Sequence, residues 1–195
     1  MVALTAVAAA VSTPVAIELE AAIGIARPYE PGFTDFSYDL APIFKLQAGV
    51  DFDDHVALSL SFVSAKGPEG TADRFPFQPA FAGWAGLVNL RLHSGGNFQF
   101  FVEGGLGPGH LIRLQENSLI DSEDHPPFSG RGALAWRIAT GVRGRVFESL
   151  WMGADLSFMT WNGVVRQASN RQEAASDLSA HALAAMLSLA FRSPL

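Results

Sequence analysis

The chain has 195 residues, of which 49% are hydrophobic and only 16% are charged, with a formal net charge of −6 and no cysteine. This composition excludes a disulfide framework and a thiolate metal site, and an acidic chain without a basic run offers nothing to bind nucleic acid. Charged residues are fewer than the roughly 25% of a typical soluble domain, yet the body of the chain holds no apolar run of the ~20 residues that a membrane helix needs. Apolar residues diluted in this way are typical of a transmembrane β-barrel, and the alternative is a soluble β-sandwich with a large core.

Residues 1–15 carry no charge and are mostly small and apolar, so we interpret them as the remnant of a secretory signal peptide. Ala8 and Ala10 suit the two small-residue positions of a cleavage site, and Ala16 is a second option. The basic segment that usually opens such a peptide is missing, so we expect the true start to lie further upstream. The alternative is an apolar N-terminal helix or strand of the mature domain. Residues 16–195 are expected to form one domain, the barrel.

Past residue 15, apolar and polar residues alternate with a period of two, as in residues 56–62, and this pattern predicts β-strands. Short polar turns at residues 53–54, 94–97 and 148–149 alternate with long polar loops at 28–37, 65–80, 115–130 and 162–177. The expected strands are residues 16–27, 38–52, 55–64, 83–93, 98 to as far as 114, 132–147, 150–161 and 178–191. Strands paired in this way predict an all-β fold, an eight-stranded antiparallel up-and-down transmembrane β-barrel.

Helix is the competing prediction for residues 178–189, because alanine and leucine favour helix intrinsically. We prefer a strand there, since an open sheet of seven strands in lipid would leave unpaired edges.

The period of two gives every strand two faces. The charge and size of the side chains indicate which face points to water and which to lipid. One face is bulky and apolar. The other is rich in Gly, Ala and Ser and carries the charges: Glu18, Glu20, Lys45, Asp51, Arg91, Glu103, Arg137, Arg143, Arg145 and Asp155. A soluble lipocalin-like ligand binder, the main alternative, would turn the bulky face inward and would need an outer face rich in Lys and Glu, which is absent. We therefore expect lipid outside and a salt-bridged, plugged lumen, in which Glu103 or Asp155 pairs with Arg143 and Glu20 pairs with Lys45.

Several large aromatic residues lie near the ends of the expected strands. Such residues form belts at lipid–water interfaces, and the alternative is ordinary packing. The candidates for the interface are Tyr38, Trp84, Trp136, Trp151 and Trp161.

Local sequence also carries a family resemblance. Residues 98–107, an aromatic run followed by glycines, and residues 49–58, a strand–turn–strand joint, resemble the small eight-stranded outer-membrane barrels, the porin-like superfamily that includes the OmpA transmembrane domain and OmpX. Phe191 resembles the terminal aromatic signal read by the barrel-assembly machinery, although four residues follow it here. The resemblance covers about residues 16–191 and implies a location in the cell outer membrane of a Gram-negative bacterium.

Three constellations could carry chemistry, and each has a simpler interpretation. The glycines of residues 104–109 lack the following helix of a phosphate-binding loop and are expected in a strand. The acidic residues 121–125 lack the ligand spacing of a Ca²⁺ site and are expected in a solvated loop. Ser179 and His181 share one strand face and could activate a serine against a lipid ester. They stand in the reverse order to the His-x-Ser pair of barrels that deacylate lipopolysaccharide, so we expect rim residues.

We therefore expect a non-enzymatic outer-membrane protein with no catalytic residue, metal or cofactor. Its role would be envelope structure, surface interaction or minor passage of small solutes. The expected partners are outer-membrane lipid, lipopolysaccharide and the assembly machinery, but not nucleic acid. The alternatives are the soluble lipocalin-like binder and a lipid-modifying barrel enzyme.

Overall fold

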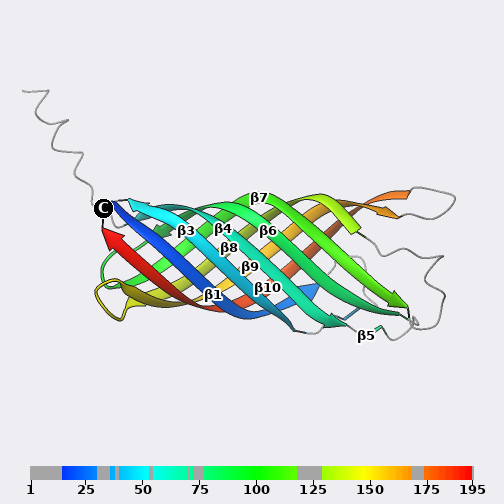
Figure 1. Ribbon diagram of the computed structural model, residues 1–195, viewed down its shortest axis with the longest axis horizontal. Coiled ribbons are helices and arrows are strands. Elements are labelled where there is room, and N and C mark those ends of the chain that lie inside the picture. Colours follow the sequence, from blue (N-terminus) through cyan, green and yellow to red (C-terminus); the bar gives the residue numbers. More distant parts are fainter. Residues whose placement is uncertain are drawn as a thin grey trace, which may run out of the picture.

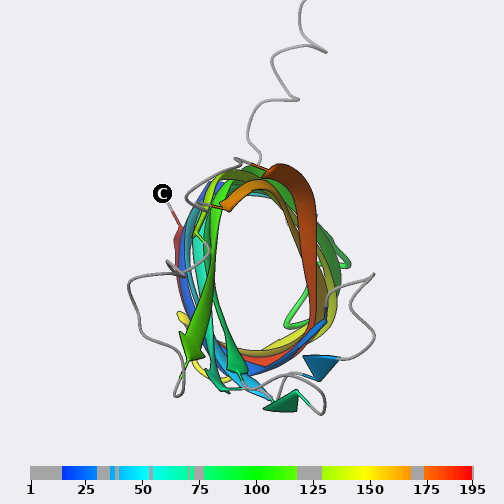
Figure 2. The ribbon, with the colours of Figure 1, turned by 90° about the vertical axis from the view of Figure 1, so that its right-hand side faces the viewer.

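The computed structural model describes residues 15–29, 36–37, 40–52, 55–69, 71–72, 77–117, 129–167 and 174–194. Eight strands close into one antiparallel barrel (Figures 1 and 2). They are β1 (Val15–Tyr29), β3 (Ala41–Phe52), β4 (Val56–Glu69), β6 (Phe77–His93), β7 (Phe98–Asn117), β8 (Ser129–Arg145), β9 (Leu150–Gln167) and β10 (Ala174–Pro194). The short strands β2 (Phe36–Ser37) and β5 (Thr71–Ala72) form a separate two-stranded sheet. Within these ranges, no helix is long and apolar enough to cross a membrane.

The predicted fold class is confirmed, and so is the strand at the end of the chain. β10 pairs with β9 on one side and with β1 on the other, which closes the cylinder. The helical propensity of its alanines and leucines is overridden because a strand in this place satisfies the backbone groups of both neighbours.

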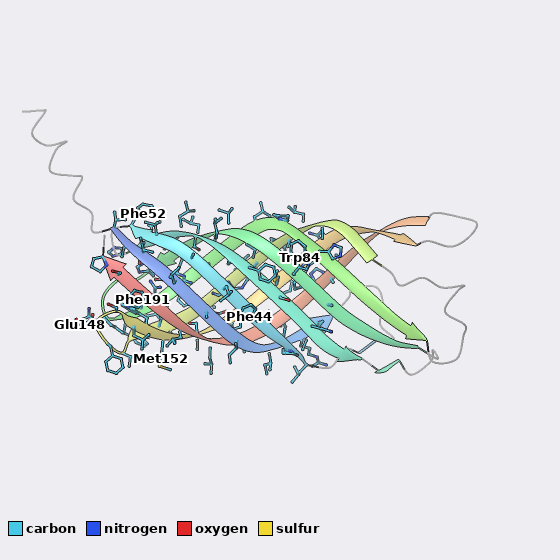
Figure 3. All side chains as sticks on the ribbon, in the orientation of Figure 1. Phe44, Phe52, Trp84, Glu148, Met152 and Phe191 are labelled. Atoms are coloured by element: carbon cyan, nitrogen blue, oxygen red, sulfur yellow. The ribbon has the colours of Figure 1, made fainter. Side chains whose placement is uncertain are left out.

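The two ends of the barrel differ. At one end, which we call the short-turn end, β3–β4, β6–β7 and β8–β9 are joined by the predicted tight connections, and Phe52, Glu148 and Phe191 lie there (Figure 3). In the β6–β7 turn, Gly95 and Gly96 have φ angles of 75° and 77°, a left-handed conformation that glycine adopts without a steric penalty. The opposite end, which carries the longer connections, is called the long-loop end.

The strands reach further toward the long-loop end than the sequence predicted. β6 pairs with β7 as far as Phe77 and Asn117, and β9 pairs with β10 as far as Gln167 and Ala174. The predicted loops at residues 65–80, 115–130 and 162–177 were therefore too long. Backbone pairing continues there through polar, glycine-containing sequence, in which the alternation that identifies a strand is lost. The acidic residues 121–125 lie outside the described residues, as do residues 1–14.

The bulky apolar face of the strands points outward. Leu58, Leu90 and Leu156 are 49%, 50% and 66% exposed, and side chains such as Phe44 and Met152 project from the outer surface in Figure 3. A soluble barrel would have enclosed these side chains in its core. The lipocalin-like alternative is therefore wrong, and the exterior is suited to lipid.

Candidate functional site

The charged residues of the strands gather inside the barrel, in the half nearest the short-turn end. Strand alternation turns all of them to the same side as Lys45 and Arg91, which are 0% exposed. We call this set the ionic layer: Glu18, Glu20, Lys45, Asp51, Arg91, Glu103, Arg137, Arg143, Asp155 and Arg192. It holds five acidic and five basic side chains linked by ion pairs, so the buried charges balance.

Arg91 on β6 lies at the centre of the ionic layer. Its Nη1 donates to Glu18 Oε1 over 2.6 Å and its Nη2 donates to Glu20 Oε2 over 2.8 Å, both on β1. Its Nε donates to Glu103 Oε2 on β7 over 2.9 Å. One guanidinium group therefore joins β1 and β7, which are not sheet neighbours, because the fork of an arginine donates in several directions at once.

Glu103 is the second centre of the layer. Besides Arg91, its carboxylate accepts hydrogen bonds from Arg137 Nη1 over 2.6 Å and from Gln47 Nε2 over 2.9 Å. Arg137 continues to Asp155 Oδ1 over 2.7 Å, and Lys45 Nζ lies 2.5 Å from Glu20 Oε1. The two carboxylate oxygens of Glu103 are thus held by β3, β6 and β8 at once.

The mouth at the short-turn end is closed by the outermost members of the ionic layer. Asp51 Oδ2 lies 3.4 Å from Arg143 Nη2, 3.3 Å from Arg192 Nη2 and 3.2 Å from His93 Nε2. Arg143 also pairs with Glu18, and both guanidinium groups lie over the ring of Trp151, at 5.4 and 5.7 Å from its centroid. Trp151 is 4% exposed, so its indole fills the mouth beside these cations.

Above the ionic layer, toward the long-loop end, the lumen is apolar. We call this the apolar layer: Ala22, Ala26, Ile43, Val63, Ala65, Ala85, Leu87, Ala133, Ala135, Met159, Trp161, Ala180, Ala182, Ala184 and Met186. Trp161 is 0% exposed and its Nε1 donates to the Trp84 carbonyl over 3.2 Å. A Cβ at Gly109 would lie 3.0 Å from Trp161 Cδ1, so this glycine of β7 makes room for the indole.

The structure brings together nine of the ten charged residues expected to face the lumen, namely Glu18, Glu20, Lys45, Asp51, Arg91, Glu103, Arg137, Arg143 and Asp155. Arg145 is instead exposed, because it is the last residue of β8 and lies outside the enclosed interior. Glu20 pairs with Lys45 as predicted, but Arg143 pairs with Glu18 and Asp51 rather than with Glu103 or Asp155. Long arginines reach diagonally across the lumen, which alternation alone does not reveal.

Sequence reasoning left four polar residues out of the proposed network. Gln47 and Gln99 share the strand parity of Lys45 and Glu103, so alternation was signal enough to find them. His93 is the last residue of β6, and Arg192 follows the point at which the last strand was predicted to stop.

The predicted interface aromatics divide into two groups. Trp84 is 40% exposed on the outer surface and Trp136 is half-buried there, whereas Trp151 and Trp161 point into the lumen. The prediction is wrong for this second pair because both residues have the inward parity of Asp155 on β9. Tyr38 lies outside the described residues. Phe191 is 52% exposed at the end of β10, and its role as an assembly signal stays a prediction.

No protein-family model matches the chain, and no curated protein matches it in sequence. In three dimensions it is similar to Neisserial surface protein A, with 10% identity, 89% of this chain and 97% of that chain covered, and a TM-score of 0.59. It is also similar to Ail, the attachment invasion locus protein of Yersinia pestis, with 14% identity, 92% and 99% covered and a TM-score of 0.56. The outer membrane protein OprG of Pseudomonas aeruginosa aligns with 12% identity, 92% and 96% covered and a TM-score of 0.55.

At these identities the likeness establishes the fold. Together with the apolar exterior and the balanced ionic interior, it defines the chain as a transmembrane β-barrel of the outer-membrane type. The resemblance to small eight-stranded outer-membrane barrels is thus confirmed, and the outer-membrane location predicted from the sequence agrees with it.

Proposed function

We propose that this protein is a non-enzymatic outer-membrane barrel that does not conduct ions. Its role is structural and depends on the loops and strand ends at its long-loop end. The filled lumen is the observation that carries the proposal. An eight-stranded barrel has an interior just wide enough for side chains to fill. Here two different fillings lie in series, an ionic layer and an apolar layer, and ions crossing the second would lose their hydration without a polar partner.

The length of the strands supports a role at the cell surface. β7 has 20 residues and β10 has 21, whereas a tilted strand crosses the hydrocarbon core in about 9–11. The remaining length extends the wall of the barrel beyond the bilayer at the long-loop end. The β2–β5 sheet joins two of the long connections there (Figure 2). Such a raised rim presents loops to partners outside the cell.

The contacts of His181 also support a non-enzymatic role. Its Nδ1 lies 2.9 Å from Thr160 Oγ1, and its ring stacks on Phe158 with centroids 5.6 Å apart. A histidine that activates a serine is usually oriented by a carboxylate, and a hydroxyl group occupies that place here.

Planar-bilayer recording tests the proposal directly. Barrel that migrates in its compact, heat-modifiable form is inserted, and we expect a flat current trace at all voltages. Discrete current steps that scale with the number of inserted barrels would contradict it. Fractionation of cells expressing the chain tests the location separately, with recovery in the outer membrane expected.

A further inference from the structure

The outer surface of β9, β10 and β1 changes character at one level. Thr160 lies ten residues along β9 from Leu150, and His181 lies ten residues along β10 from Phe191. This is the length in which a strand crosses the hydrocarbon core, about 9–11 residues. The positions of outward parity around this level are polar, although Thr160 among them is only 1% exposed. We call them the headgroup patch: Arg27, Thr160, Asn162, Ser179 and His181.

The patch is a compact arrangement across three neighbouring strands. Thr160 is directly opposite His181, and Asn162 is directly opposite Ser179. Arg27 is exposed on β1 opposite Leu183, two residues from His181, so Arg27 and His181 are diagonal neighbours across the ladder. The Ser179 hydroxyl, the Asn162 amide, the His181 imidazole and the Arg27 guanidinium group therefore share one outward face at the level of the lipid headgroups. The Thr160 hydroxyl is 1% exposed and contacts His181 Nδ1 over 2.9 Å, so it orients the imidazole.

Aromatic rings border this patch. The Trp136 and Phe158 ring centroids lie 5.3 Å apart, and Phe158 stacks on His181. Flat ring faces beside hydroxyl and amide groups suit a sugar, whose apolar face packs on a ring while its hydroxyls bond at the edge. The guanidinium group of Arg27 adds a partner for phosphate.

An apolar groove lies next to the patch on the same outer surface. Its lining includes Ile25, Arg27, Leu156, Phe158, Leu183 and Ala185, and it extends to Ile138 of β8 and Val102 of β7. Leu156 and Leu183 are 66% and 56% exposed, so the groove is open to lipid and accepts an acyl chain. Arg27 belongs to both surfaces, and Phe158 lines the groove and stacks on His181 of the patch, so the two surfaces are continuous.

We propose that the headgroup patch and this groove bind one phosphorylated glycolipid of the outer leaflet, with its phosphorylated sugar on the patch and an acyl chain in the groove. The proposal rests on the proposed function only in requiring that the barrel spans the outer membrane. The positive charge of Arg27 selects an anionic lipid, and the rings of Trp136 and Phe158 at the border of the patch favour a sugar in the lipid headgroup.

The opposite side of the barrel supplies matched controls. Trp84 stacks on Phe62 and His110 with centroids 6.2 and 5.9 Å apart, and Lys66 is exposed on the neighbouring strand β4. Around these residues the strands pair Lys66 with Ala82 and Trp84 with Ser64 and His110, so this cluster of aromatic rings and a cation has no opposed amide and hydroxyl like Asn162 and Ser179. A general effect of interfacial aromatics or charge would act on both sides alike.

The test is a titration of the folded full-length barrel, in detergent micelles, with lipopolysaccharide and with the same lipopolysaccharide stripped of its lipid A phosphates. We expect Arg27→Gln to weaken binding of the intact lipid about tenfold and to leave binding of the stripped lipid unchanged. Asn162→Ala and Trp136→Leu should weaken binding of both lipids. Lys66→Gln and Trp84→Leu should bind both as the parent does.

Heat-modifiable migration verifies that each variant is folded before titration. Equal losses on the two sides of the barrel, or unchanged binding in all patch variants, would overturn the site and leave only an ordinary aromatic belt. Neither result bears on whether the barrel conducts or where it resides, which bilayer recording and fractionation decide.

Discussion

Arg91 and Glu103 lie directly opposite each other across the β6–β7 ladder, and Arg91 Nε donates to Glu103 Oε2 over 2.9 Å. Both side chains are fully enclosed, at 0% and 1% exposed. From this pair, hydrogen bonds extend to Glu18 and Glu20 on β1 and to Arg137 on β8. The pair therefore braces the barrel across its lumen, in addition to the backbone ladder that runs around its wall.

Glu103→Ala should destabilise the barrel by about 3–5 kcal/mol. It leaves the Arg91 Nε and Arg137 Nη1 donors buried without the carboxylate that accepts from them. Urea unfolding from phospholipid vesicles measures the free energy. Glu148→Gln, an exposed carboxylate in the β8–β9 turn, is the control and should stay within about 0.5 kcal/mol of the parent. Similar costs at the two positions would mean that the ionic layer contributes nothing special to stability.

Removing two partners of the layer should cost less than removing one. Arg137→Leu leaves Asp155 buried without the guanidinium group that lies 2.7 Å away. Adding Asp155→Leu removes that unpaired charge, while Glu103 still forms an ion pair with Arg91. We expect the double variant to be about 1–3 kcal/mol more stable than Arg137→Leu alone. The same urea unfolding gives the three values, and simple additivity of the two single costs would contradict the expectation.

Alternation of residue types was enough to predict the closed barrel, its outward face and most of the ionic layer. It works because every strand in the bilayer has one wall against lipid and one against the lumen, so Lys45 and Glu103 could not be placed elsewhere. The error at Trp151 and Trp161 came from position near a strand end, a weaker criterion than the parity that both share with Asp155.

Two features could not be predicted from the sequence, and both depend on the register between strands. The partners of Arg143 are one, because the choice among Glu18, Asp51 and Glu103 depends on the stagger of strands around the cylinder. The extent of the strands at the long-loop end is the other, since pairing there is maintained by backbone hydrogen bonds rather than by a two-residue pattern.

The depth dependence of charge on the outer face tests the lipid-facing surface. Leu60, which is 66% exposed, lies in the middle of the apolar stretch of β4, and Leu92, 53% exposed, lies beside the short-turn end of β6. Leu60→Arg should destabilise the barrel by about 2–4 kcal/mol in vesicles, and Leu92→Arg by about 0–1 kcal/mol. Equal losses of stability in the two variants would mean that Leu60 does not lie deeper in the hydrocarbon core than Leu92.

The two layers of the lumen act as barriers in series, so opening one should leave the barrel closed. Arg91→Ala with Glu103→Ala removes the centre of the ionic layer as a balanced pair, while Trp161→Ala removes the largest side chain of the apolar layer. Neither variant should conduct in planar bilayers, because ions must still cross the intact layer. The triple variant should show discrete current steps. Heat-modifiable migration must show that all three variants are folded. A current through the Arg91→Ala, Glu103→Ala variant or through the Trp161→Ala variant would show that a single layer seals this barrel.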